Sequence, residues 1–148
     1  MFVATLQATS EEGDESSLPI VLAHLADLEC WAGKWQLAER YAADSLDAAE
    51  QVEHRAWRTM AVYAQGLVDA HLGRVAAARA RVREGMAWAV SANDAWSLMF
   101  LHSVLGFAEL SAGDLARAET CLSAAANLSE RIGLAEPAAW RFHATSRP

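Results

Sequence analysis

Apolar residues recur along this chain at the three- and four-residue spacing of a helix, without strand-like alternation. The segment after His54 shows the pattern clearly, with apolar side chains at Trp57, Met60, Ala61, Ala64, Val68 and Leu72. This spacing gathers side chains on one face of an α-helix. Alanine is also abundant, and it favours helix and lets neighbouring helices approach closely. The pattern therefore predicts an all-α protein.

The pattern repeats every 40 residues. Glycine recurs at Gly33, Gly73 and Gly113, alanine follows each glycine by five residues, and a small residue precedes each by seven. A second series, 20 residues later, includes Asn93 and Gly133, which suit the left-handed residue that ends many helices. Such a period is typical of stacked repeats, in which each unit buries its apolar face against its neighbours. We therefore predict two helices per period, over residues 18–32, 35–52, 55–72, 75–92, 95–112 and 115–132.

Several residues mark helix starts. Pro19 falls in the first turn of the first predicted helix, where its missing N–H costs no hydrogen bond, and Ser16 and Ser17 precede it as candidate N-caps. Asp94 and Asp114 stand directly before two later helices. We expect both aspartates to cap the helices that follow them.

Charge and composition narrow the function classes. The formal net charge is −7 at pH 7, which leaves no basic footprint for DNA, RNA or an anionic membrane. No apolar run approaches the roughly 18 residues of a membrane span, and the first residues lack the basic start of a secretory signal. The bias toward arginine and alanine is typical of a GC-rich bacterial genome. We expect a cytoplasmic protein without direct nucleic-acid or membrane contact.

A small residue at Ala26, Gly66 and Gly106, followed twelve positions later by alanine, resembles the tetratricopeptide (TPR) pattern. The resemblance implies a right-handed TPR-like α-solenoid of about three 40-residue helix pairs. The period departs from the family's 34 residues, and on period alone a HEAT-like repeat is the alternative. The family's aromatic residue, three positions after the small one, is replaced here by an acid. These acids are Glu29, Asp69 and Glu109.

The chain contains four longer segments, residues 13–51, 67–89, 105–133 and 134–143. They resemble the helical-repeat region of large LuxR-type bacterial transcription regulators that carry an ATP-binding module. In that family a nucleotide-binding switch domain and a helix-turn-helix flank a TPR-like middle, and this sequence contains neither. The Gly33-Lys34 pair lacks the upstream glycine of a phosphate loop, so we expect no nucleotide cofactor. We therefore expect a slice of a longer solenoid, or a stand-alone remnant of one. Residues 1–17 would end a preceding repeat, 18–133 would be TPR-like repeats (pairs 18–52, 55–92 and 95–132), and 134–148 would start a further helix and a tail.

The TPR resemblance also implies which positions face the concave side, where that family binds ligands across the first helix of each pair. These positions carry apolar and aromatic side chains with few charges, which suits an amphipathic helix, an apolar peptide or a small apolar effector. The alternative is that they pack against neighbouring helices, as apolar periodicity usually indicates. They are Asp27, Trp31, Met60, Tyr63, Leu67, His71, Phe100, Ser103, Phe107 and Leu110.

Residue types associated with chemistry give weaker signals. The five histidines are dispersed, with no pair three or four residues apart, so we expect no metal site. Cys30 and Cys121 lie more than two repeats apart, and we expect buried, reduced thiols. The six tryptophans fit packing at the junctions of helices better than stacking on a nucleobase or sugar.

The column of acids at Glu29, Asp69 and Glu109 permits general acid–base catalysis or cation binding, but no nucleophile, base and orienting group converge with it. A solvated face, or partners for arginines such as Arg40, Arg79 and Arg117, is the simpler interpretation. The arginine run Arg74, Arg79, Arg81 and Arg83 similarly reads as an exposed face. We therefore expect neither catalysis nor a cofactor.

These features predict a non-catalytic binding module, acting by protein–protein interaction or effector sensing through the concave groove. It would resemble the regulatory middle region of a LuxR-type transcription regulator. The first alternative is a scaffold that self-associates through its end faces, for example as a homodimer. The second is a small-molecule carrier or enzyme that uses the groove.

Overall fold

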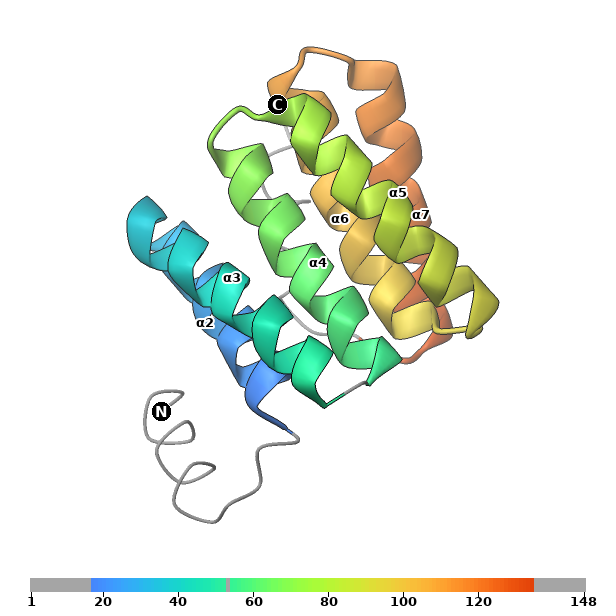
Figure 1. Cartoon of the computed structure of the whole chain (residues 1–148). Coiled ribbons are helices and arrows are strands. Elements are labelled where there is room, and N and C mark those ends of the chain that lie inside the picture. The colour runs from blue at the N-terminus through green and yellow to red at the C-terminus, as the bar shows by residue number, and fades with distance from the viewer. Residues whose placement is uncertain (1–16, 53, 135–148) are drawn as a thin grey trace.

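The structure is a computed structural model that describes residues 17–52 and 54–134. These residues form six α-helices and, within those ranges, no β-strand, so the all-α prediction is confirmed (Figure 1). Each helix begins at the predicted residue and ends one residue early, because the last predicted residue occupies the C-cap position. The helices are α2 (Leu18–Trp31), α3 (Trp35–Gln51), α4 (Arg55–His71), α5 (Val75–Ser91), α6 (Ala95–Ser111) and α7 (Leu115–Arg131).

Left-handed residues end the helices where the glycine series predicts them. Gly113, with a φ of +78°, follows α6, and Asn93, with a φ of +52°, follows α5. The Gly113 N–H donates to the Leu110 carbonyl at 3.0 Å, and the Asp114 N–H donates to the Glu109 carbonyl at 3.0 Å. These bonds satisfy carbonyls that the end of α6 would otherwise leave unpaired. Glycine adopts a positive φ without steric cost, and asparagine tolerates it better than most residues.

The helix starts confirm the predicted capping bonds of two aspartates, whereas a serine at a third N-cap makes no such bond. The Asp94 carboxylate accepts a hydrogen bond from the Ser97 N–H at 3.0 Å, and the Asp114 carboxylate accepts one from the Arg117 N–H at 3.1 Å. Ser17 occupies the N-cap position of α2, but its hydroxyl makes no capping hydrogen bond. The predicted position of Ser17, directly before a helix with proline in its first turn, is therefore confirmed, but no side-chain bond caps α2.

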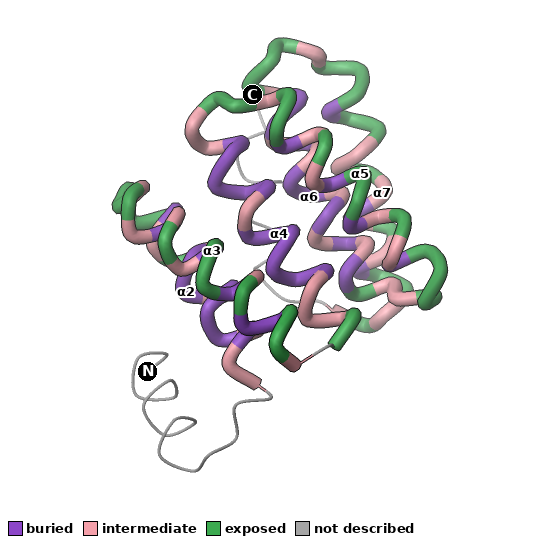
Figure 2. The backbone as a smooth tube through the Cα atoms, viewed as in Figure 1, coloured by how far each residue is buried: buried purple, intermediate pink, exposed green. Residues whose placement is uncertain are grey.

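The helices enclose a core centred on α4. Each helix packs against the next one along the chain, and α4 also packs against both α2 and α6. Every residue from Thr59 to Ala70 except Gln65 is buried, which makes α4 largely purple in Figure 2. Gly66 shows why small residues recur at these contacts. A Cβ placed there would already touch Val104 and Val82 at 3.5 Å, so a longer side chain would push α4 away from its neighbours.

No helix in the described part of the chain is long and apolar enough to cross a membrane. Residues 1–16 and 135–148 lie outside the described ranges. The predictions of a preceding repeat helix and of a further helix with a tail fall almost entirely on those segments.

Candidate functional site on the face of α2, α4 and α6

Four helices bring aromatic side chains together around His71. Trp31 ends α2, Trp35 begins α3, His71 ends α4 and Phe107 lies in α6. The His71 ring centroid lies 5.5 Å from that of Trp31, 5.4 Å from that of Trp35 and 4.6 Å from that of Phe107. These separations are those of favourable ring contacts. We call these four residues the His71 cluster.

The polar groups of the His71 cluster are held in a largely apolar setting. The indole N–H of Trp31 donates to the Asp27 carboxylate at 2.7 Å. The His71 Nε2 atom is buried and has no hydrogen-bond partner. Burial lowers the pKa of His71, and the negative charge of Asp27 only partly opposes this shift. The imidazole is therefore neutral at pH 7 and contributes an aromatic ring rather than a charge.

The nearby thiol is not poised for chemistry. Cys30 is 1% exposed, and burial, together with the charge of Asp27, raises its pKa to about 12. The nucleophilic form of cysteine is the thiolate, which is almost absent at neutral pH at that pKa. Cys30 and Cys121 are both free, and Cys121 is half-buried rather than buried. The proximity of Cys30, Asp27 and His71 therefore does not make a nucleophilic site.

A second aromatic group lies nearer the start of α6. The Phe100 ring centroid is 5.1 Å from that of Tyr63 on α4 and 5.4 Å from that of Trp96 on α6. Trp96 keeps 43% of its surface exposed. Phe100 and Trp96 extend the aromatic surface along α6, next to the buried Tyr63 ring of α4.

The structure divides the ten predicted groove residues by burial. Met60, Tyr63, Leu67 and Ser103 are buried, and Leu67 has no exposed surface at all. These four support the face from beneath rather than form its surface. The other six are half-buried, except for Trp31, which is exposed. They are Asp27, Trp31, His71, Phe100, Phe107 and Leu110.

Sequence reasoning left Trp35 and Trp96 out of the groove, although both join these aromatic groups. Trp35 is the first residue of α3 and Trp96 the second residue of α6, and each of these helices begins one linking residue after a helix-ending glycine or asparagine. That location predicted packing at a helix junction, and the contact of Trp35 with His71 confirms it. A ring at a helix junction also borders the surface that several helix ends form. This location could have identified Trp35 and Trp96 as residues of the site.

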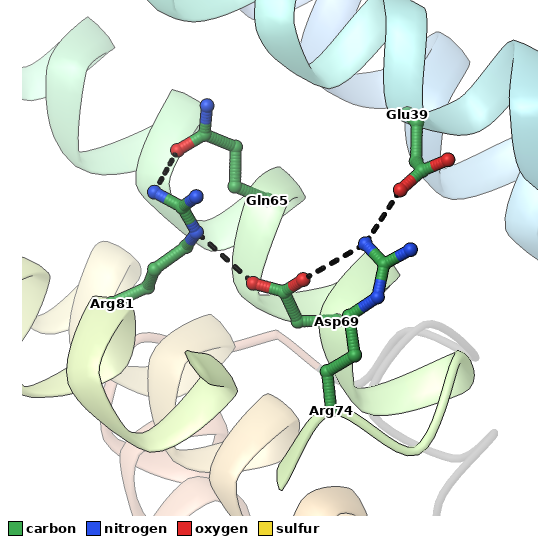
Figure 3. Close-up of polar contacts among 5 residues, drawn as sticks. All are labelled: Glu39, Gln65, Asp69, Arg74 and Arg81. Atoms are coloured by element: carbon green, nitrogen blue, oxygen red, sulfur yellow. Dashed lines mark hydrogen bonds and ion pairs between the residues drawn. The ribbon is translucent and has the colours of Figure 1, made fainter. Parts of the chain in front are cut away.

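Two of the three acids in the column, Asp69 and Glu109, are buried and paired with arginines. Asp69 is 7% exposed and accepts a hydrogen bond from the Arg81 Nε at 3.0 Å, while Arg74 lies 3.5 Å from its other oxygen. Figure 3 shows that Arg81 also donates to Gln65, at 2.7 Å, and Arg74 to Glu39, at 2.6 Å. The interpretation as a solvated face was wrong for Asp69, and the partners of Asp69 come from the arginine run. This network ties α5 to α4 and α3.

Glu109 is paired with an arginine that precedes it in the sequence, whereas the arginines that pair with Asp69 follow it. Glu109 is 3% exposed, and the Arg79 guanidinium donates to its two oxygens at 2.8 and 2.6 Å. This contact confirms Arg79 as a partner of the column and shows that Arg79 is not part of a simple exposed face. Arg117 instead lies 3.5 Å from Asp114, and Glu29 is paired with Lys34 at 3.3 Å. Paired in this way, the acids act as structural links between helices.

The sequence period explains why Glu109 needs a different partner from Asp69. Cys121 occupies the position of Arg81 one period later, and a cysteine is too short to reach a carboxylate on the preceding helix. A cavity of about 400 Å³ lies there instead, between α5, α6 and α7. Its lining is mixed apolar and basic. The lining residues are Arg79, Val82, Arg83, Met86, Leu105, Glu109, Arg117, Thr120 and Cys121.

Replacing Arg79 by methionine should reverse the pH dependence that Glu109 contributes to stability. The hydrogen bonds from Arg79 hold the pKa of Glu109 below its ordinary value of 4.5, against the opposing effect of burial. In the native protein this contribution is present above pH 4.5 and is lost as the pH falls through the lowered pKa. In Arg79→Met, burial raises that pKa instead, so stability should increase on acidification from pH 7 to pH 5.

This prediction is checked by urea unfolding at several pH values, with Arg83→Met as the control. Arg83 lies on the same helix, is exposed and pairs with no acid in the described part of the chain. Parallel pH profiles for Arg79→Met and the native protein would show that Glu109 stays ionised without Arg79. The proposed structural role of the pair would then be incorrect.

Among the residues that the structure describes, no three histidine, cysteine or acidic side chains lie close enough together to hold a metal ion. The arrangement offers aromatic and apolar contact surface with one carboxylate, Asp27, and a neutral imidazole. Comparison with protein-family models, with curated proteins and with solved structures found no match for this chain.

Proposed function

We propose that the protein is a non-catalytic binding module with a TPR-like solenoid arrangement, which binds an amphipathic helix of a partner protein across the face of α2, α4 and α6. These three are the first helices of the predicted pairs. The packing of α4 against α2 and α6, together with that of each helix against the next, supports this arrangement. An amphipathic helix is the segment that best matches a mainly apolar face of helices.

The His71 cluster is the observation that carries this proposal. It gathers rings from four helices, and Trp31 keeps 43% of its surface exposed. Tryptophan and tyrosine dominate the energetics of protein interfaces, because large rigid rings bury much area at little entropic cost. The neutral state of His71 keeps this surface apolar at pH 7. A partner would therefore place its apolar side chains against Trp31 and Phe107.

The resemblance to LuxR-type regulators suggests how such binding would regulate a linked domain. A partner or effector that binds one arrangement of the repeats more tightly than another shifts the equilibrium between them by that difference in affinity. In a regulator, this shift would relieve the autoinhibition of a switch domain. Self-association through this face or the end faces is the competing proposal.

Trp31→Ala should weaken peptide binding by about 10- to 30-fold, as expected for an interface anchor. The probe is a displayed library of random 16-residue peptides, selected on the native chain and then measured individually by calorimetry. We expect the selected peptides to carry apolar residues at helical spacing. Leu115→Ala is the matched control, because Leu115 is 69% exposed but lies on α7.

Selected peptides that bind Trp31→Ala and the native chain equally would place the binding surface elsewhere. Light scattering on the Phe100→Asp, Phe107→Asp double variant distinguishes partner binding from self-association. Loss of peptide binding in this variant, with the oligomeric state of the native chain unchanged, supports partner binding on the face. A dimer that dissociates in the variant would show that this face serves self-association instead.

A further inference from the structure

A cavity of about 470 Å³ lies at the start of α4, the end of that helix opposite the His71 cluster. It is lined by Glu50 from the end of α3, Arg55 and Arg58 from the first turn of α4, and Trp88 from the end of α5. Three of these four side chains, those of Glu50, Arg55 and Arg58, are charged.

The two arginines of this cavity have no acidic partner in the described part of the chain, although Glu50 lines the same space. The guanidinium carbon of Arg58 lies 5.0 Å from the centroid of the Trp88 ring. This cation–π contact holds Arg58 without using its N–H donors. The Arg58 Nε atom is buried and lacks a hydrogen-bond partner, which is costly for a charged donor. The cavity thus presents donors that lack acceptors.

The residues of this cavity do not recur one 40-residue period later in the sequence. One period later, Arg58 and Trp88 correspond to Leu98 and Leu128, an apolar combination. His54 corresponds to Asp94, whose carboxylate caps α6. The His54 side chain makes no capping hydrogen bond, so the positive end of α4 has no carboxylate where α6 has one. Both differences favour an anion at the start of α4.

We propose that this cavity binds the phosphate group of a small phosphate ester. Arg55 and Arg58 would donate to the phosphate oxygens, since arginine matches tetrahedral oxyanions with several donors in one plane. Glu50 repels a bare anion, so it selects a ligand whose hydroxyl groups can donate to its carboxylate. The formal net charge of the chain is −7, so general attraction of anions to the protein does not account for such a site.

This site is separate from the proposed peptide-binding face. Arg55 and His71 begin and end α4, and at 1.5 Å per residue they lie about 24 Å apart along the helix axis. Phosphate binding and peptide binding can therefore be measured, and can fail, independently.

The experiment is calorimetric titration of the intact chain with glycerol 3-phosphate and with inorganic phosphate, against sodium chloride at matched ionic strength. We expect glycerol 3-phosphate to bind more tightly than inorganic phosphate. Arg58→Gln should weaken both at least tenfold. Arg40→Gln, which removes an exposed arginine on α3, should leave both affinities unchanged.

Two further variants test the geometry without removing a partly buried side chain, since Glu50 and His54 are exposed. Glu50→Gln should tighten inorganic phosphate and reduce the preference for the ester. His54→Asp, which reproduces the arrangement at Asp94, should weaken both ligands. Equal loss in Arg40→Gln and Arg58→Gln would show non-specific electrostatics and overturn the proposal. A titration no different from sodium chloride would overturn it as well.

Discussion

Leu67→Ala should lower the free energy of unfolding by about 3 kcal/mol, within the range of about 2–5 kcal/mol for leucine-to-alanine changes in protein cores. Leu67 has no exposed surface, and it lies in α4, which packs against α2, α3, α5 and α6. Few neighbours can close in on the space that its side chain would leave, because α4 is held on several sides. Urea unfolding followed by circular dichroism measures this loss.

The control for Leu67→Ala is Leu110→Ala. Both residues were predicted groove positions, but Leu110 is half-buried on α6. The part of its side chain already in water loses no burial, so we expect a loss of about 1 kcal/mol. A Leu67→Ala protein of native stability with weakened peptide binding would mean that Leu67 belongs to the binding surface.

Gly106→Ala should destabilise the protein by about 2 kcal/mol, whereas Gly66→Ala should stabilise it by up to about 1 kcal/mol. These glycines occupy the same position of the 40-residue period. At Gly106, an added Cβ would lie 2.6 Å from the Leu122 Cγ and Cδ2 atoms and 3.4 Å from the Leu122 backbone nitrogen. Because Cγ is the branch point of the side chain, Leu122 must change rotamer or α7 must move away from α6.

At Gly66 the nearest side-chain atoms, on Val104 and Val82, would lie 3.5 Å from the added Cβ. That is ordinary van der Waals contact, so the gain in helix propensity is retained. Urea unfolding of the two single variants, measured side by side, compares one substitution in two contexts. Equal destabilisation of the two variants would show that the loss of stability arises within the helix that holds each glycine. The close approach of α6 and α7 would then not be its cause.

The helix boundaries could be predicted because their determinants act over one turn. Gly113 takes a positive φ, and the Asp114 carboxylate accepts from a backbone N–H three residues away. Both interactions depend on residues close in sequence. Ser17 marks the limit of this reasoning, since it stands at the N-cap without making the capping bond.

The candidate site was predicted in part. Trp31 and His71 occupy the same position of the 40-residue period, and Phe107 lies four residues before that position in α6. The structure brings these three rings into one cluster. It also buries Met60 and Leu67, which the TPR resemblance placed on the same face. The sequence distinguishes residues on one face of a helix, but the amount of each that neighbouring helices cover depends on how closely those helices approach.

By itself, the sequence determined the helical class, the positions of the six helices and the residue types available on each face. Only the tertiary structure decided which charges are paired. Arg79 reaches Glu109 across 30 positions in the sequence, while Arg58 lies over the Trp88 ring and, like Arg55, has no acidic partner in the described residues. The physical reason is range. Capping and helix propensity act within a turn, whereas pairing of charges and covering of apolar faces depend on distances that only the packed helices define.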